Sequence, residues 1–162
     1  MLGTGLTAVL VVGILATAVI YGTDVFCALV LRPAAARAGD ASVADLVGHI
    51  HHFGDHRLPA VGVVSVLAAL LAAVGAVLTD ASLPALLGAG VALVALLGWL
   101  AVYLTVSAPL NRHLREAAST HTVPPETRSW QQRWDAVIWP RVVLQTVALA
   151  GLLTAGLQVG AS

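Results

Sequence analysis

The chain has 162 residues, of which 59% are hydrophobic and only 10% are charged, and its eight basic and eight acidic side chains leave no net charge. Soluble domains carry about 25% charged residues, so this composition excludes a soluble globular protein and predicts an integral membrane protein. The balanced charge argues against a nucleic-acid partner, and the single cysteine, Cys27, excludes an internal disulfide.

The first apolar run, from about residue 2 to 31, predicts a transmembrane helix. At about 1.5 Å per residue, the run can cross about 30 Å of hydrocarbon with some tilt. A signal peptide is the competing interpretation, but no basic residue precedes the run, and the run is longer than the apolar core of a signal peptide. We expect Arg32-Pro33 to end this helix, because proline lacks an amide hydrogen and disfavours helical geometry in the residue before it.

A short amphipathic helix is predicted next, over about residues 43–56. Its apolar residues recur at helical spacing, and they are Leu46, Val47, Ile50 and Phe53. Such a helix would lie at the membrane surface or under the bundle.

Three further apolar runs predict the remaining transmembrane helices, over about 58–78, 83–107 and 136–157. Pro59 fits the first turn of the second helix, where a missing amide costs little, and Pro109 is expected to close the third. The predicted fold class is therefore all-α. It is an integral membrane four-helix bundle with a short amphipathic helix in the first loop, and it forms a single domain over 1–162.

The arginines predict the orientation of the bundle. Arg32, Arg37 and Arg57 follow the first helix and four more lie within 109–135, whereas the turn near residue 80 and both ends of the chain have none. The positive-inside rule then places both polar segments in the cytoplasm and both termini outside. The expected partner is the lipid bilayer, and the sequence leaves open whether copies of the chain form a homo-oligomer.

Residues 48–59 hold four of the six histidines, which are His49, His51, His52 and His56. His52 and His56 are four residues apart, so a helix would present both on one face as a two-ligand arm for zinc, copper or iron. Candidates for a third ligand are His49, Asp24, His113 and Asp55. The alternative is a set of surface histidines that bind no metal.

Asp24 and Arg141 lie inside predicted transmembrane helices, where an unpaired charge costs a few kcal/mol. Both belong to the half of the bundle near the polar segments, so we expect them to form an ion pair. The pair either orients two helices or belongs to a site. Polar and aromatic residues share helix faces with them, namely Thr17 and Tyr21, then Trp99, Tyr103, Ser107 and Asn111, then Trp134, Ile138 and Gln145. These faces predict a pocket that opens toward the cytoplasmic side.

The chain resembles a family of small four-helix membrane proteins that includes the fungal anthrone oxygenases and many bacterial members. The matching residues, in order, are Tyr21 and Asp24, then His51, Asp55, Arg57 and Pro59, then Pro109-Leu110-Asn111, then Trp130, Trp134 and Arg141. The resemblance implies oxidation of an electron-rich polycyclic phenol, from an anthrone to an anthraquinone, often without an identified cofactor. It also implies that the chain resides in a bacterial plasma membrane.

The resemblance implies that the functional residues are His51, Asp55, Asn111, Trp134 and Arg141. Asp24 joins the catalytic candidates through its expected ion pair. The expected substrate-binding residues are Tyr21, Trp99, Tyr103 and Trp134. Members of the family often have an Asn-His pair shortly before the arginine, where this chain has Ile138 and Trp139. His49, His52 and His56 are candidate replacements and candidate metal ligands.

The predicted function is therefore an oxygen-dependent oxidoreductase that acts on a lipophilic phenol-like substrate. In this hypothesis His51 takes a proton, Arg141 stabilises the resulting phenolate, and the anion reacts with dioxygen directly or at a metal. The sequence leaves the cofactor undecided: the protein uses no cofactor, a histidine-bound iron or copper ion, or haem. The alternative functions are a non-enzymatic metal- or haem-binding membrane protein and an accessory subunit that docks a partner enzyme.

Overall fold

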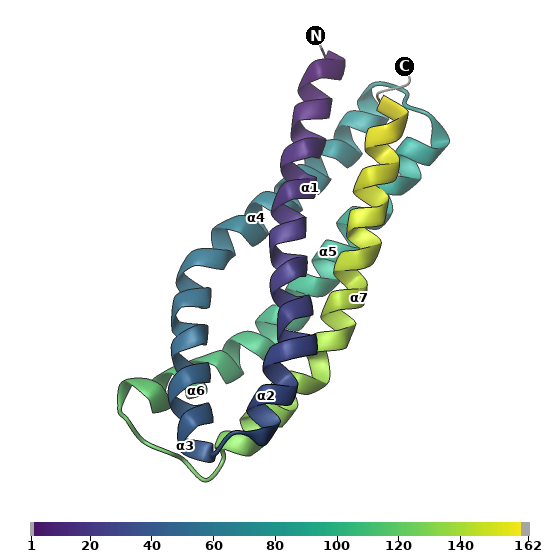
Figure 1. Cartoon of the computed structure of the whole chain (residues 1–162). Coiled ribbons are helices and arrows are strands. Elements are labelled where there is room, and N and C mark those ends of the chain that lie inside the picture. Colours follow the sequence, from purple (N-terminus) through teal and green to yellow (C-terminus); the bar gives the residue numbers. More distant parts are fainter. Residues whose placement is uncertain (1, 160–162) are drawn as a thin grey trace.

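The computed structural model describes residues 2–159, which form a bundle of long helices without strands (Figure 1). Four helical segments are long and apolar enough to cross a membrane, and they are Thr4–Arg37, Asp40–Leu78, Leu83–Ser119 and Thr127–Val159. The predicted all-α four-helix bundle is confirmed. Both ends of the chain lie at one end of the bundle, and the connections at 38–39 and 120–126 lie at the other (Figure 1).

Three of the four segments contain a π-helical turn. The first consists of α1 (Leu2–Phe26), the turn Cys27–Leu31 and α2 (Arg32–Arg37). The second consists of α3 (Asp40–Ser42), the turn Val43–Val47 and α4 (Gly48–Leu78). The third consists of α5 (Leu83–Val102), the turn Tyr103–Ser107 and α6 (Ala108–Ser119). The fourth is α7 (Thr127–Val159) alone.

The helices continue past the two prolines that were expected to end them. Pro33 and Pro109 each lie in the first turn of the helix that follows a π-helical turn. A proline cannot donate to the carbonyl four residues earlier, and a π-helical turn changes the bonding partners at that place, so the helix adapts instead of ending. The predicted helix ends at residues 31 and 107 are therefore wrong.

The segment predicted as a separate helix, 43–56, is helical but continues into the second transmembrane helix. Pro59 lies inside α4, and α4 bends about halfway along (Figure 1). A proline inside a helix commonly bends it without ending it. The fourth helix likewise starts at Thr127 and not near residue 136. The histidine-rich segment is thus the first part of a membrane-spanning helix, which holds its side chains at fixed positions in the bundle.

Alanines make up much of the buried interior of the bundle, next to a few large side chains such as Leu96 and Leu152, and many other large apolar side chains face outward. Ala69 is fully buried, whereas 63% of Leu15 and 69% of Val94 are exposed. Within a bilayer, lipid is as apolar as a protein core, so helices associate mainly where small residues allow close approach. At Gly88, an added Cβ would lie 2.7 Å from the carbonyl oxygen of Gly151. This packing fixes α5 against α7, the two helices that carry much of the site.

Candidate active site

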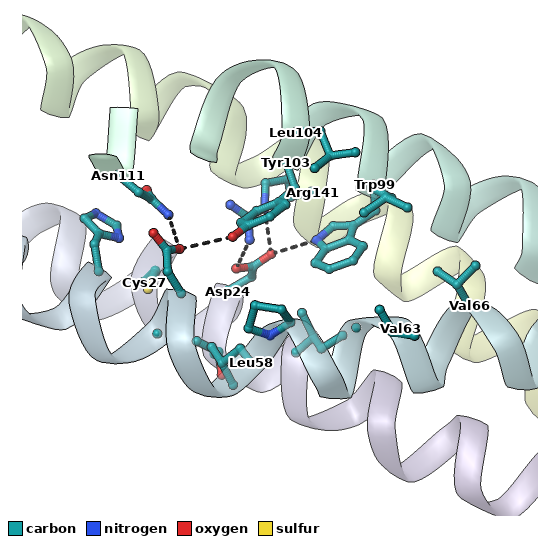
Figure 2. Close-up of a pocket in the computed structure, with 18 of the residues that line it drawn as sticks. Asp24, Cys27, Leu58, Val63, Val66, Trp99, Tyr103, Leu104, Asn111 and Arg141 are labelled. Carbon is teal, nitrogen blue, oxygen red and sulfur yellow. Dashed lines mark hydrogen bonds and ion pairs between the residues drawn. The ribbon is translucent and has the colours of Figure 1, made fainter. Parts of the chain in front are cut away.

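A cavity of about 360 Å³ lies between α1, α4, the α5–α6 segment and α7 (Figure 2). The polar or aromatic side chains that line it are Thr23, Asp24, His51, Asp55, Trp99, Tyr103, Asn111, Trp134 and Arg141. The rest of the lining is apolar, apart from the thiol of Cys27. Cys27 and Tyr103 are the first residues of two π-helical turns, a local structure that is frequent at functional sites.

The predicted ion pair between Asp24 and Arg141 is present and buried, with 2% and 6% of the two residues exposed. Arg141 binds both oxygens of the carboxylate, since Nε donates to Oδ2 at 3.0 Å and Nη2 donates to Oδ1 at 2.8 Å. Its Nη1 donates to Oγ of Ser107 at 2.8 Å. This two-point contact fixes the plane of the guanidinium and leaves its remaining N–H groups for a ligand.

Asp24 accepts two further hydrogen bonds besides those from Arg141. Gln145 Nε2 donates to its Oδ2 at 2.7 Å, and Trp99 Nε1 donates to the same oxygen at 3.4 Å. A buried ion pair is tolerated only where such additional hydrogen bonds replace the lost water. Asp24 therefore holds Arg141 in place and is poorly suited to take a proton from a ligand.

Three aromatic rings surround the guanidinium of Arg141. Its Cζ lies 5.9 Å from the ring centres of both Trp99 and Tyr103, and 5.7 Å from that of Trp134. Trp99 and Tyr103 stack on each other with their ring centres 6.0 Å apart and an interplanar angle of 16°. Cation–π attraction acts over about 6 Å, so these rings stabilise the cation and also offer flat surfaces to an aromatic ligand.

Asp55 is the centre of a second polar cluster. Its Oδ1 accepts hydrogen bonds from Tyr103 Oη at 3.1 Å and from Asn111 Nδ2 at 2.8 Å (Figure 2). Arg115 Nη1 lies 3.5 Å from Oδ2. Arg115 was not among the residues predicted from the sequence, although its position four residues after Asn111 places both on one face of α6. This cluster ties α4 to the α5–α6 segment at the end of the cavity near the polar connections.

His51 lines this cavity with a buried imidazole nitrogen that is available for a hydrogen bond to a ligand. Only 7% of the residue is exposed, and its Nε2 has no hydrogen-bond partner among residues 2–159. Trp134 lies beside it, with the ring centres 5.2 Å apart, and its Nε1 is also unpartnered among these residues, as is Asn111 Oδ1. A buried polar atom without a partner costs about 1–3 kcal/mol, so three of them around one cavity indicate a place for a polar ligand.

The structure brings almost all of the predicted catalytic and substrate-binding side chains around this one cavity. Tyr21 is the exception, because it packs against the apolar cluster that contains Trp134 and Ile138 and does not line the cavity. The apolar part of the wall that α4 contributes was also not predicted. A stripe of residues four apart could have revealed this wall, and its members are Gly54, Leu58, Gly62 and Val66.

The predicted metal site on the histidine arm is not formed. The rings of His52 and His56 do lie close, with centres 4.6 Å apart, but His49, His52 and His56 are exposed and none lines the cavity. In the part of the chain that the structure describes, no group of three His, Cys, Asp or Glu side chains could hold a metal ion. Nδ1 of His49 and of His56 instead contacts a backbone carbonyl one helical turn earlier.

Comparison of the chain with models of protein families, with curated proteins and with solved structures finds no match. The cavity and its side chains are therefore the basis for assigning a function.

Proposed function

We propose that this protein is a membrane-embedded oxidoreductase that oxidises a lipophilic, phenol-like aromatic substrate with dioxygen. The observation that carries the proposal is the buried, unpartnered Nε2 of His51 in the same cavity as the guanidinium of Arg141. A base and a fixed cation around an apolar, aromatic-walled space suit a ring system that must lose a proton to become reactive.

His51 is the proposed general base. With the imidazole proton on Nδ1, the unpartnered Nε2 can accept the proton of a phenolic hydroxyl, and the ring of Trp134 lies beside the imidazole. A neutral imidazole has one nitrogen that can accept a proton. General bases of this kind contribute about 10²- to 10⁴-fold to a rate.

Arg141 is the proposed partner of the phenolate oxygen. Asp24 neutralises the guanidinium overall, so the stabilisation acts through the directed N–H groups that Asp24 and Ser107 leave unused. Such preorganised donors stabilise a developing charge best in a site that excludes water. In this scheme Asp24 is a positioning residue, and so is Asp55, because Tyr103, Asn111 and Arg115 already engage its carboxylate.

For an anthrone, the proposed reaction balances without a further reductant. Loss of one proton gives an anion whose charge is shared between the oxygen and the ring carbon opposite it. That carbon gives its electrons to dioxygen and forms a carbon–oxygen bond. In total, one ring methylene group and one molecule of dioxygen yield one ring carbonyl group and one molecule of water, so that one oxygen atom stays in the product and the other leaves.

The test uses the protein in lipid nanodiscs with anthrone as the probe. Oxygen consumption and anthraquinone formation are measured above the rate of protein-free nanodiscs, because anthrones also oxidise slowly in air. We expect His51→Gln to lower the protein-dependent rate at least a hundredfold. The matched control is His52→Gln, which changes the next residue, an exposed histidine outside the cavity. A rate in His51→Gln equal to that of the control would refute the role of His51.

Ligand binding without oxidation is the second candidate function. The hydrogen-bonded Asp24–Arg141 pair favours it, because this pair also suits a purely structural role in orienting α1 and α7. In that case anthrone binds with defined stoichiometry, and oxygen consumption stays at the protein-free rate.

A further inference from the structure

The two sides of the cavity differ in the residues that line them. Toward the polar connections, the hydrogen-bonded cluster of Asp55, Tyr103, Asn111 and Arg115 joins α4 to the α5–α6 segment. His51 and Asn111 are themselves buried there. The sequence predicted an opening on this side. The polar cluster lies there, and Ile50, which precedes His51, also lines the cavity with 38% of the residue exposed.

On the side between α4 and the α5–α6 segment, the lining residues are apolar and exposed. The exposed fractions are 56% for Val63, 51% for Leu67 and 58% for Leu104. Figure 2 shows Leu104 on one side of the cavity and Val63 and Val66 on the other. These residues belong to the long apolar runs of candidate membrane spans. A side chain that is both exposed and part of the cavity wall marks a rim, and this rim faces hydrocarbon.

Polarity therefore increases from the rim inward. The unpartnered groups, His51 Nε2 and Trp134 Nε1, belong to buried residues, and so does the guanidinium of Arg141. A molecule dissolved in the bilayer could pass the rim without exposing its polar atom to a polar surface, and its oxygen would meet donors and an acceptor only inside. Water-soluble ions would have to cross hydrocarbon to reach the same rim.

From this gradient we propose that the ligand enters sideways from the bilayer, between α4 and the α5–α6 segment, with its oxygen leading. The ligand class is a flat, apolar ring system with a hydroxyl or carbonyl oxygen at one end. The rings of Trp99 and Tyr103 line the cavity and offer flat surfaces to such a ligand. Gly54 leaves open space in the α4 wall, since a Cβ there would have only Leu58 within reach, at 4.0 Å, whereas at Gly62 the ring of Trp99 already packs 3.1 Å from the place of a Cβ. The proposal rests on the proposed function in treating this cavity as the ligand site, but it does not require oxidation.

The experiment follows the entry of 1-hydroxypyrene, a lipophilic polycyclic phenol, into the protein in nanodiscs. Energy transfer from the cavity tryptophans to the pyrene reports arrival. A cavity-filling variant, Gly54→Leu, places its side chain in open space of the cavity wall and gives the signal from probe that is merely dissolved in lipid. We expect the rim variant Val63→Phe with Leu104→Phe to slow association at least tenfold. The matched control is Val74→Phe with Val94→Phe, on the same two helices and exposed but outside the cavity lining.

Equal association rates in the rim variant and the control would overturn lateral entry, and so would a wild-type signal no larger than that of Gly54→Leu. Circular dichroism of each variant confirms that it is folded. Anthrone oxidation is measured in parallel to separate the two proposals. Entry at the expected rates without oxidation supports lateral entry and contradicts the oxidoreductase. Oxidation of anthrone together with no effect of the rim variant on association supports the oxidoreductase and contradicts lateral entry.

Discussion

Replacing Asp24 by asparagine is expected to destabilise the protein strongly although the change is conservative. The substitution leaves the guanidinium of Arg141 buried without its counter-charge. It also puts an NH2 group where one carboxylate oxygen now accepts from Arg141, at 2.8 or 3.0 Å. If the NH2 group replaces Oδ2, it also confronts the donor of Gln145, which now lies 2.7 Å from that oxygen. Breaking a buried pair by removing one partner costs about 3–5 kcal/mol, which is a large part of the stability of a domain.

The assay is unfolding of the protein in mixed micelles by increasing sodium dodecyl sulfate, followed by circular dichroism. A double-mutant cycle with Arg141→Met completes the test, because removing both charges is expected to cost less than Asp24→Asn alone. The control is Asp40→Asn, which removes an ion pair with Arg128 in which 61% of the Asp40 side chain is exposed, so its loss should cost about 1 kcal/mol or less. A cost for Asp24→Asn no greater than that of this control would refute the reasoning.

Two further predictions concern packing and the second polar cluster. Gly88→Ala should destabilise the bundle by about 1–3 kcal/mol, because its Cβ would lie 2.7 Å from the carbonyl oxygen of Gly151, while Gly90→Ala, with no atom within 4 Å of the new Cβ, should not. Equal unfolding midpoints for the two variants would contradict the close approach of α5 and α7. Tyr103→Phe should cost about 0.5–1.5 kcal/mol by the same assay, because it removes the hydroxyl that donates to Asp55 at 3.1 Å. An unchanged midpoint would mean that this hydrogen bond adds nothing to stability.

The sequence correctly predicted the ion pair inside the bundle and the aromatic residues around it. Asp24 and Arg141 were predicted to pair because an isolated charge in hydrocarbon is expensive, and the structure places them in two-point contact. The aromatic stripes were found from helical spacing, which fixes the direction of side chains on a helix. Trp99, Tyr103 and Trp134 do surround the guanidinium.

The sequence failed where the answer depends on packing between helices. A proline is a stop signal when its segment is considered alone, but Pro33 and Pro109 follow π-helical turns, and the helix continues. Tyr21 shares a face with Asp24, yet it packs in an apolar cluster beside the cavity. The histidine spacing predicted a metal arm, but no third ligand joins it, and the described part of the chain holds no group of three ligand-type side chains.

The sequence by itself determined that this chain is a four-helix membrane protein, because the transfer of each apolar run into lipid depends on its local composition and length alone. It also determined which residue types had to find partners. Only the tertiary structure decided that Asp55 is bound by Tyr103, Asn111 and Arg115, that His51 Nε2 is left without a partner among the described residues, and that the cavity has its rim between α4 and the α5–α6 segment. Those features arise from contacts between residues far apart in the chain, and helical periodicity gives the direction of a side chain but not the neighbour that it meets.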